Sequence, residues 1–244
     1  MKKRIVTIAL VVALLATCFG GTLAFLKDTD AQVNTFTTGN VYITLDESVV
    51  SNVNGNLVAT GTRTSTTQNY HLFPGMTVDK DPTITLNAGS EDAYLAAKVT
   101  VTSAAGTDIH SLIGIEYGHM LALQGFLKGG CAEVGATEQT GHPLNGRNGI
   151  RVYGDGTYSV WQEIINNEGQ YTYVFYVFIE GAKSAGYSVK LFEQMVINPA
   201  WDNAEMNILN GVNIKVEAFG VQANGFTSCY QAMTEAFGNQ FNFK

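Results

Sequence analysis

Four histidines could bind a catalytic zinc ion in this chain: His71, His110, His119 and His142. The zinc helix of metalloproteases needs two histidines four residues apart, with a glutamate beside the first, and the sequence contains no such HExxH pattern. His110, Glu116 and His119 could share a helix. The nine residues from His110 to His119 span about two and a half turns, which places the two histidines on opposite faces. We therefore predict no zinc site.

Neighbouring carboxylates are a second candidate for metal binding, because Ca²⁺ prefers oxygen ligands. Three such pairs stand in loop or strand-end positions: Asp28 and Asp30, Asp46 and Glu47, and Asp79 and Asp81. Their more usual role is that of solvated turn residues on an acidic surface. The sequence also has no Gly-x-Ser-x-Gly elbow and no phosphate-binding loop. We expect no catalytic residue and no cofactor.

The first 24 residues have the order of a secretory signal. Basic residues 2–4 precede an apolar run, residues 5–19, and small residues lead up to Ala24. The run has about 15 residues, whereas a transmembrane helix needs about 20. An uncleaved anchor and a lipoprotein at Cys18 are the alternatives. We predict a signal-peptide helix that is cut between Ala24 and Phe25, and a secreted chain that meets the membrane only before that cut.

The charge balance excludes two classes of partner. The chain has 14 Lys and Arg against 21 Asp and Glu, a net charge of −7, and loss of the signal removes three of the basic residues. The mature chain is therefore strongly acidic and has no basic cluster. Binding to nucleic acid or to anionic lipid requires concentrated Lys and Arg, so we expect neither.

Alternation of apolar and polar residues with a period of two is the main structural signal, and it predicts strands with one buried face. It occurs in four segments: residues 41–45, 83–86, 95–102 and 212–218. Residues 171–179 are apolar on both faces, which favours a central strand or one packed against a neighbouring subunit. Asn54-Gly55 and Asp155-Gly156 are typical of hairpin turns.

After the signal, helices are expected in only two places, residues 108–127 and residues 228–237. Many strands with few helices favour an all-β fold, a jelly-roll-like antiparallel β-sandwich. Residues 128–149 are predicted to form a long surface loop. Cys131 and Cys229 remain after signal cleavage; they could pair as a disulfide, as exported cysteines often do, or stay as two buried thiols.

The N-terminal region has a motif of about 20 ordered positions. It reads GGTLAFLKDTD at residues 20–30 and NTFTTGNV at residues 34–41. Looser motifs follow at three places: LFPG at residues 72–75, the strand at residues 93–102 and VEAFGVQANGF at residues 216–226. These segments resemble the TasA/camelysin family, although Leu26 stands where Phe or Tyr is more usual. Residues 105–170 carry no such resemblance.

The resemblance implies a jelly-roll sandwich that is secreted by a Gram-positive bacterium after processing by a SipW-type signal peptidase. It also implies a subunit of a surface or biofilm-matrix fibre, a homopolymer to which accessory fibre proteins can add. In fibre-forming members the freed N-terminus adds as a strand to the next subunit. This assigns residues 1–24 to the signal, 25–40 to a donor strand and 41–244 to one domain. The apolar anchors of the donor would be Phe25, Leu26, Val33 and Phe36.

Two alternatives stay open. One is a monomeric adhesin that binds a ligand such as a glycan through residues 128–149 and the aromatic side chains of Tyr153, Tyr158 and Trp161. The other is a metallopeptidase of the camelysin type, which the histidine spacing disfavours.

Overall fold

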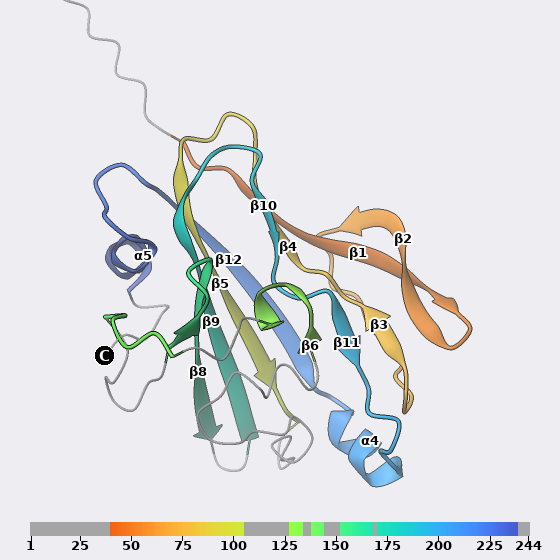
Figure 1. Ribbon diagram of the computed structural model, residues 1–244. Helices are drawn as coiled ribbons and strands as arrows, with labels where there is room; N and C mark the ends of the chain where they lie inside the picture. The colour runs from red at the N-terminus through yellow and green to blue at the C-terminus, as the bar shows by residue number, and fades with distance from the viewer. Residues whose placement is uncertain (1–39, 105–126, 134–137, 144–151, 168–169, 239–244) are drawn as a thin grey trace, which may run out of the picture. The chain divides into compact units, whose positions relative to one another are not determined.

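The alternating segments form strands, and the strands assemble into two sheets in the computed structural model of the 244-residue chain (Figure 1). The structure describes residues 40–104, 127–133, 138–143, 152–167 and 170–238. All of them belong to one compact unit, Gly39–Lys244.

The first sheet has seven strands in the order β10-β4-β1-β2-β3-β11-β6. Along the chain they are β1 (Ile43–Val53), β2 (Asn56–Thr64), β3 (Thr77–Asp79), β4 (Thr83–Leu86), β6 (Leu127–Lys128), β10 (Ser188–Lys190) and β11 (Gln194–Val196). Neighbouring strands are antiparallel, except that β2 and β3 meet in parallel. β1 pairs with β4 over residues 43–46 and with β2 over residues 47–53, so it changes partner part-way along its length.

The second sheet has five strands in the order β12-β5-β9-β8-β7. They are β5 (Ala93–Thr102), β7 (Tyr153–Gly154), β8 (Tyr158–Asn167), β9 (Gln170–Lys183) and β12 (Asn213–Gln222). β9 lies between β5 and β8, and its residues 173–179 are all buried. This confirms the prediction of a central strand that is covered on both faces.

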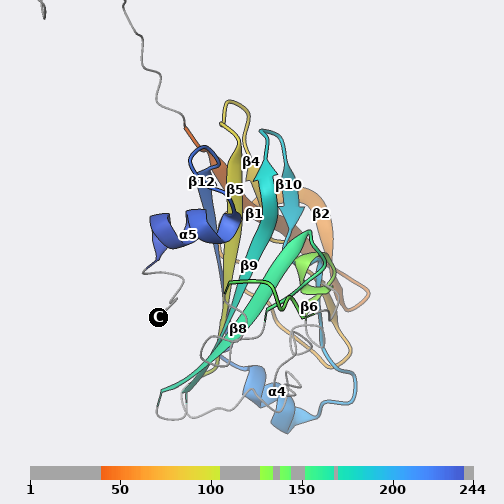
Figure 2. The ribbon, with the colours of Figure 1, turned by 60° about the vertical axis from the view of Figure 1, so that its left-hand side comes forward.

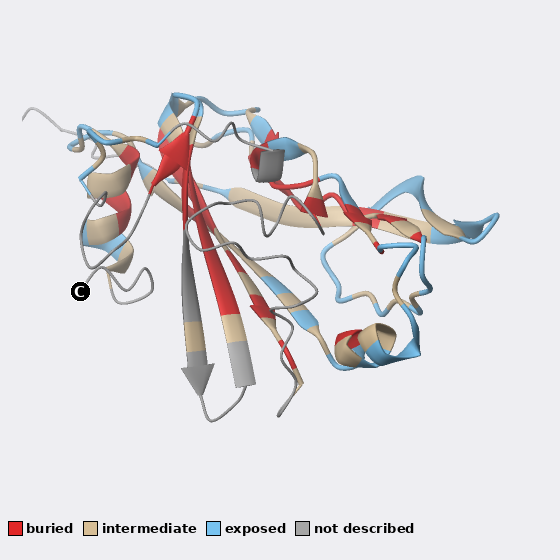
Figure 3. Cartoon of the chain, turned by 60° about the horizontal axis from the view of Figure 1, so that its bottom comes forward, coloured by how far each residue is buried: buried red, intermediate tan, exposed pale blue. Residues whose placement is uncertain are grey.

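Two apolar clusters hold these layers together. The larger lies between the sheets and includes Ile84 and Leu86 of β4 with Leu95, Val99 and Phe175 of the second sheet. The smaller lies on the other face of the second sheet, under a C-terminal helix. Figure 3 shows the buried residues concentrated in the strands of the second sheet, whereas the distal part of the β1–β2 hairpin is exposed.

Two α-helices and one turn of 3₁₀ helix complete the described structure: α4 (Asn203–Leu209), α5 (Cys229–Phe237) and η1 (Gly130–Glu133). Asp202 begins α4 with a reciprocal capping box to Glu205, and Ser228 caps α5. α5 contacts β12, β5 and β9 (Figure 2). None of the helices among the described residues has the length and hydrophobicity that a membrane crossing requires.

Both predicted hairpins are confirmed. Asn54 and Gly55 join β1 to β2 with φ angles of 52° and 86°, the left-handed values that a two-residue turn of this type needs. In the turn from β7 to β8, Gly156 also has a positive φ, and the Asp155 carboxylate accepts a hydrogen bond of 2.7 Å from the backbone N of Thr157.

The all-β, sandwich-like fold is confirmed, and so is the predicted C-terminal helix, which is α5. α4 was not predicted, because seven residues are too few to display a helical period. The helix expected at residues 108–127 lies outside the described residues except for Leu127, which begins β6. The boundaries proposed at residues 24 and 40 stay predictions.

Candidate functional site

Among the described strands, β12 is an outer strand of the second sheet and pairs with one neighbour only. Its ten residues pair antiparallel with β5, from Asn213 opposite Thr102 to Gln222 opposite Ala93. Within the part of the chain that the structure describes, no strand pairs with its second edge. Because a strand edge presents unpaired backbone donors and acceptors, this edge can accept a further strand.

The side chains of β12 alternate between the interior and the surface. Ile214, Val216 and Ala218 are half-buried and pack against the core between the sheets. Between them, Lys215 and Glu217 form an ion pair of 2.7 Å on the outer face. The edge strand therefore has an apolar inner face that its own domain covers only in part.

β1 faces β12 at the same margin of the sandwich. A Cβ on Gly220 of β12 would lie 3.0 Å from side-chain atoms of Val41 and Ile43, so the absence of a side chain there permits the close approach of the two segments. Six half-buried aliphatic residues meet along this line, which we call the β1–β12 seam: Val41, Ile43, Leu45, Ile214, Val216 and Ala218.

The seam opens into a groove beside the start of β12. A hollow of about 240 Å³ lies between residues 45–47, residues 64–68 and residues 213–216. A larger hollow of about 760 Å³ is lined by residues 67–72, by α4 and by residues 209–214. The two hollows adjoin, because five residues line both of them: Thr67, Gln68, Lys80, Asn213 and Ile214.

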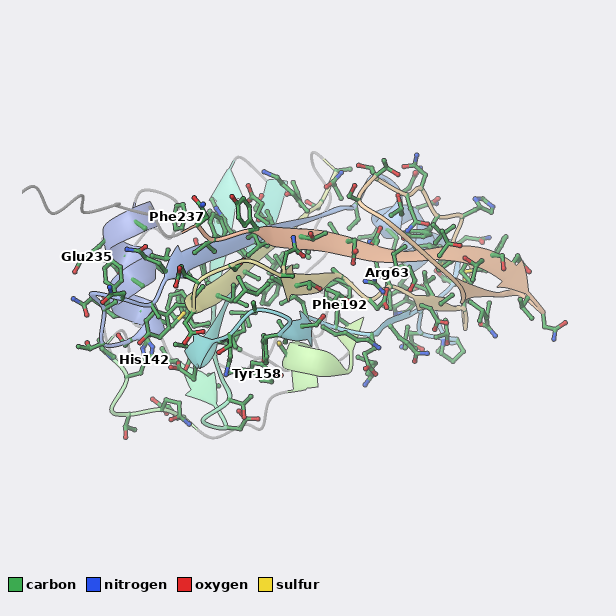
Figure 4. The ribbon with its side chains drawn as sticks, turned by 90° about the horizontal axis from the view of Figure 1, so that it is seen from above. Arg63, His142, Tyr158, Phe192, Glu235 and Phe237 are labelled. Atoms are coloured by element: carbon green, nitrogen blue, oxygen red, sulfur yellow. The ribbon has the colours of Figure 1, made fainter. Side chains whose placement is uncertain are left out.

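Charged residues at the base of the β1–β2 hairpin bind one another beside this groove. Arg63 donates to Asp46 through Nε at 2.6 Å and to Asp81 through Nη1 at 2.9 Å; Figure 4 shows Arg63 on the hairpin side of the domain. Ser48 donates to Asp81 from its backbone N at 2.7 Å and from its hydroxyl at 3.1 Å. Burial alone would raise the pKa of Asp81, but the bonds from Ser48 and Arg63 outweigh it and hold that pKa below its ordinary value.

A second ion pair joins Lys80 to Glu47. The Tyr70 hydroxyl donates to Glu47 at 3.4 Å, and Gln68 donates to the same carboxylate oxygen at 3.1 Å. Burial, together with the charge of Glu47, raises the pKa of Tyr70, so the phenol stays a neutral donor at physiological pH. This cluster fixes the loop after β2 against β1 and so forms a wall of the groove.

The carboxylates considered as calcium ligands are therefore engaged with protein groups. Asp46, Glu47 and Asp81 face Arg63 or Lys80, and Asp79 accepts hydrogen bonds of 2.9 Å from the backbone N of Ala59 and from Gln194. These four carboxylates bind protein groups, so they are neither arranged as calcium ligands nor simply solvated turn residues. Both interpretations made from the sequence therefore need correction. Asp28 and Asp30 lie outside the described residues.

Two of the four histidines can be placed. His71 is exposed and meets the ring of Phe73 edge-on. His142 lies beside Trp161, Phe178 and Tyr230 (Figure 4), and burial lowers its pKa.

The described residues do not fit a metal centre, because no three His, Cys, Asp or Glu side chains among them come together. His110, Glu116 and His119 lie outside the described residues, so the spacing argument made for them stays a prediction.

Cys131 and Cys229 are free, buried thiols rather than a disulfide. Cys131 belongs to the core between the sheets and donates to the carbonyl of Lys190 at 3.3 Å. Cys229 belongs to the cluster under α5 and donates to the carbonyl of Leu95 at 3.2 Å. Burial raises the pKa of Cys131 to about 12 and also raises that of Cys229, so neither is a reactive thiolate.

The aromatic residues of the adhesin alternative do not form an exposed ligand surface. Tyr153 and Trp161 are only 5% and 2% exposed. Trp161 stacks on Tyr176 with ring centroids 5.0 Å apart, as a core residue does. Tyr158 is half-buried. Residues 134–137 and 144–149 of the proposed binding loop are outside the described residues.

The residues predicted for signal cleavage and strand donation also lie outside the described residues: Ala24, Phe25, Leu26, Val33 and Phe36. The sequence analysis did not predict which strand lies at the edge of its sheet. The alternation at residues 212–218 predicted a strand, but only the strand order shows that this strand is an edge. The pairing of Arg63 with carboxylates 17 and 18 residues away has no local signal at all.

Comparison with known protein families gives a match at the N-terminal side of the chain. Residues 1–104 match the family model described as camelysin metallo-endopeptidase, which covers the N-terminal segment and β1 to β5. No curated protein and no solved structure matches the chain. The sequence resemblance noted above is thereby confirmed.

Proposed function

We propose, from the match of residues 1–104 to the model of the camelysin family, that this chain is a secreted structural subunit whose freed N-terminal segment completes the β12 edge of the next subunit. The observation that carries this proposal is the edge of β12 with which no described strand pairs, beside a seam of half-buried aliphatic side chains.

Export would prepare the donor. A SipW-type signal peptidase would cut between Ala24 and Phe25 and leave residues 25–40 as a new N-terminus ahead of β1. Before the cut, this segment is tethered at the membrane and cannot reach a neighbour. After the cut, the subunit is released to the cell surface or the extracellular matrix.

The donor and the acceptor are similar in length. Twelve residues, 25–36, span about 40 Å when extended, and the ten residues of β12 span about 33 Å. Alternation places Phe25 and Val33 on one face of such a strand, and Leu26 and Phe36 on the other. One face would then cover the inner side of the seam, and the other would lie on the outside of the sandwich.

The seam supplies the driving force for this contact. Full burial of an aliphatic side chain is worth about 1.5–3 kcal/mol, so covering the exposed half of each of the six seam residues would contribute about 1 kcal/mol apiece. Backbone hydrogen bonds along the β12 edge would add geometric specificity. A contact that joins the N-terminus of one copy to β12 of the next is head-to-tail, and it generates a filament. Accessory fibre proteins with the same N-terminal segment could add it as a strand to the same β12 edge.

The proposal includes no catalytic step. The family model carries the description of a metallo-endopeptidase, but the described residues do not supply three metal ligands in one place. A casein-cleavage assay with and without chelator tests this point. Chelator-sensitive cleavage by the purified mature chain would show that the filament proposal leaves out an enzymatic function.

Deletion of residues 25–36 tests the donor. The shortened chain keeps the whole of the described domain, so we expect it to fold and to stay monomeric in negative-stain microscopy and light scattering, under conditions in which the mature chain forms filaments. Filaments of the shortened chain that form as readily as those of the mature chain would contradict the proposal.

A labelled synthetic peptide of residues 25–36 tests the acceptor separately. We expect it to bind the shortened chain and to raise its Tm. A control peptide with Val33→Asp and Phe36→Asp should do neither. Binding that is equally strong for both peptides would show that the contact does not depend on these anchors.

A further inference from the structure

The larger hollow beside α4 has a chemistry that strand donation does not use. Asn203, Met206, Asn207 and Asn210 all line it. Asn203, Met206 and Asn207 lie three and four residues apart, which puts them on one face of α4, and Asn210 is the C-cap of this helix. Three of these four side chains are amides, and the fourth is an apolar methionine.

Further polar residues come from the other walls. Asn69 and His71 are exposed in the loop between β2 and β3, and Asn213 stands at the start of β12. Among the described residues, five of the lining asparagines have no hydrogen-bond partner for their side-chain amides: Asn69, Asn203, Asn207, Asn210 and Asn213. Each amide offers two donors and one acceptor group, so the hollow is rich in unused hydrogen-bonding capacity.

The described residues that line this hollow include no acidic residue and no unpaired Lys or Arg, although the chain is acidic. No Asp or Glu lines it, in a chain that carries 21 of them. Lys80 is the one Lys or Arg among the described lining residues, and its amine is paired with Glu47. A phosphate, a nucleic acid or a polyanion would therefore meet no available cation there.

The floor of the hollow is apolar. Leu72, Met206, Val212 and Ile214 line it and are half-buried, and the ring of Tyr70 lies beside them. The volume of about 760 Å³ falls within the range of ordinary ligand sites, about 300–1,000 Å³. A ligand that fits this site is neutral, has many groups that both donate and accept hydrogen bonds, and presents apolar faces between them.

These features match a carbohydrate better than a peptide strand. An extended peptide takes its regular hydrogen bonds from a strand edge, and here only Asn213 and Ile214 at the start of β12 belong to one, whereas α4 and residues 67–72 provide no strand. Sugar hydroxyls both donate and accept, as side-chain amides do, and the C–H faces of sugar rings suit an apolar floor. We propose that this hollow, the asparagine groove (residues 67–72, α4 and residues 209–214), binds a segment of neutral polysaccharide. The groove shares Asn213 and Ile214 with the acceptor strand β12, whereas α4 and residues 67–72 take no part in strand donation.

The test compares glycan binding by the mature chain and by matched asparagine variants. The probe is an array of neutral gluco-, galacto- and manno-oligosaccharides together with oligosaccharides that bear uronate or sulfate. Calorimetry on the best neutral probe follows. The groove variant combines Asn203→Ala and Asn207→Ala, substitutions that favour a helix and so keep α4 folded. The control is Asn224→Ala, an exposed asparagine after β12 that does not line the groove.

We expect the mature chain to bind at least one neutral oligosaccharide. The affinity should fall about tenfold or more in the groove variant, because two amides each lose hydrogen bonds to the ligand, and it should be unchanged in the control. No binding of a neutral probe, binding of anionic probes alone, or equal affinity of the two variants would each overturn the proposal.

Filament formation serves as a separate readout. If the groove variant loses filaments while the mature chain binds no glycan, the groove belongs to the donor peptide, and the carbohydrate proposal is wrong. If filaments form normally and no neutral glycan binds, the carbohydrate proposal fails alone, and strand donation is unaffected.

Discussion

Substitution of Val216 by Asp is the sharpest perturbation of the proposed subunit contact. Val216 is half-buried in the seam and lies on the edge strand β12. In the free subunit the new carboxylate can stay hydrated at the open margin. A donated strand would cover it, so the substitution acts on assembly much more than on folding.

The magnitude follows from two terms. The valine loses about 1 kcal/mol of further burial on assembly. The covered carboxylate must give up its water or take up a proton, and protonation at pH 7 of a group with a pKa of about 3.9 costs about 4 kcal/mol. The sum is about 5 kcal/mol per contact, which corresponds to a critical concentration for assembly that is more than about a thousandfold higher.

The pH dependence identifies the cause. The protonation cost nearly vanishes at pH 4, so Val216→Asp should regain most of its assembly there, whereas Val216→Asn should assemble equally weakly at both pH values. Val58→Asp is the matched control, because Val58 is 38% exposed on the β1–β2 hairpin, away from the seam.

Sedimentation gives the critical concentration of each variant, and circular dichroism checks its fold. If folded Val216→Asp assembles at pH 7 at the same concentration as Val58→Asp, the seam is not covered in the filament, and the reasoning fails.

Three further predictions concern the domain itself. Asp81→Asn should lower the free energy of unfolding at pH 7 by about 2 kcal/mol, measured with urea, because charged hydrogen bonds to Arg63 and Ser48 are lost. The pKa of Asp81 in the folded chain lies below its ordinary value of 3.8, so its contribution to the free energy of unfolding is present above about pH 4 and is lost as the pH falls through the folded pKa. If acid lowers the free energy of unfolding equally in the wild type and in Asp81→Asn, this account of Asp81 is wrong. Cys131 and Cys229 should not react with a thiol reagent at pH 8 until urea unfolds the chain, and rapid labelling of the native protein would show that they are not buried. Gly220→Ala should lower the Tm, because its Cβ would lie 3.0 Å from side-chain atoms of Val41 and Ile43. Gly141→Ala is the control and should leave the Tm unchanged, because its Cβ would have no heavy atom within 4 Å. Equal Tm values for the two variants would contradict the close contact of β1 with β12.

The fold could be predicted where local signals carry it. Alternation located the strands, Asn54-Gly55 fixed the first hairpin, and Ser228 with the residues after it predicted α5. Each of these signals lies within about ten residues of sequence, so no tertiary information was needed. The apolar run at residues 171–179 even predicted that β9 is central.

The candidate site could not be predicted in the same way, because it depends on contacts between distant residues. Nothing near Val216 tells whether a strand lies on one side of β12 or on both. Asp46 and Asp81 suggested calcium from the sequence because their partner Arg63 is remote in the chain. The asparagines of α4 line a hollow only because residues 67–72, which are remote in the sequence, line it too.

A structure of the assembled filament by electron cryomicroscopy, at a resolution that shows side chains, tests the central claim most directly. The account predicts one additional strand beside β12 of every subunit, with the sequence of residues 25–36 and continuous with β1 of the adjacent subunit. A filament in which the β12 edge stays free, or in which that strand comes from the same subunit, would contradict it.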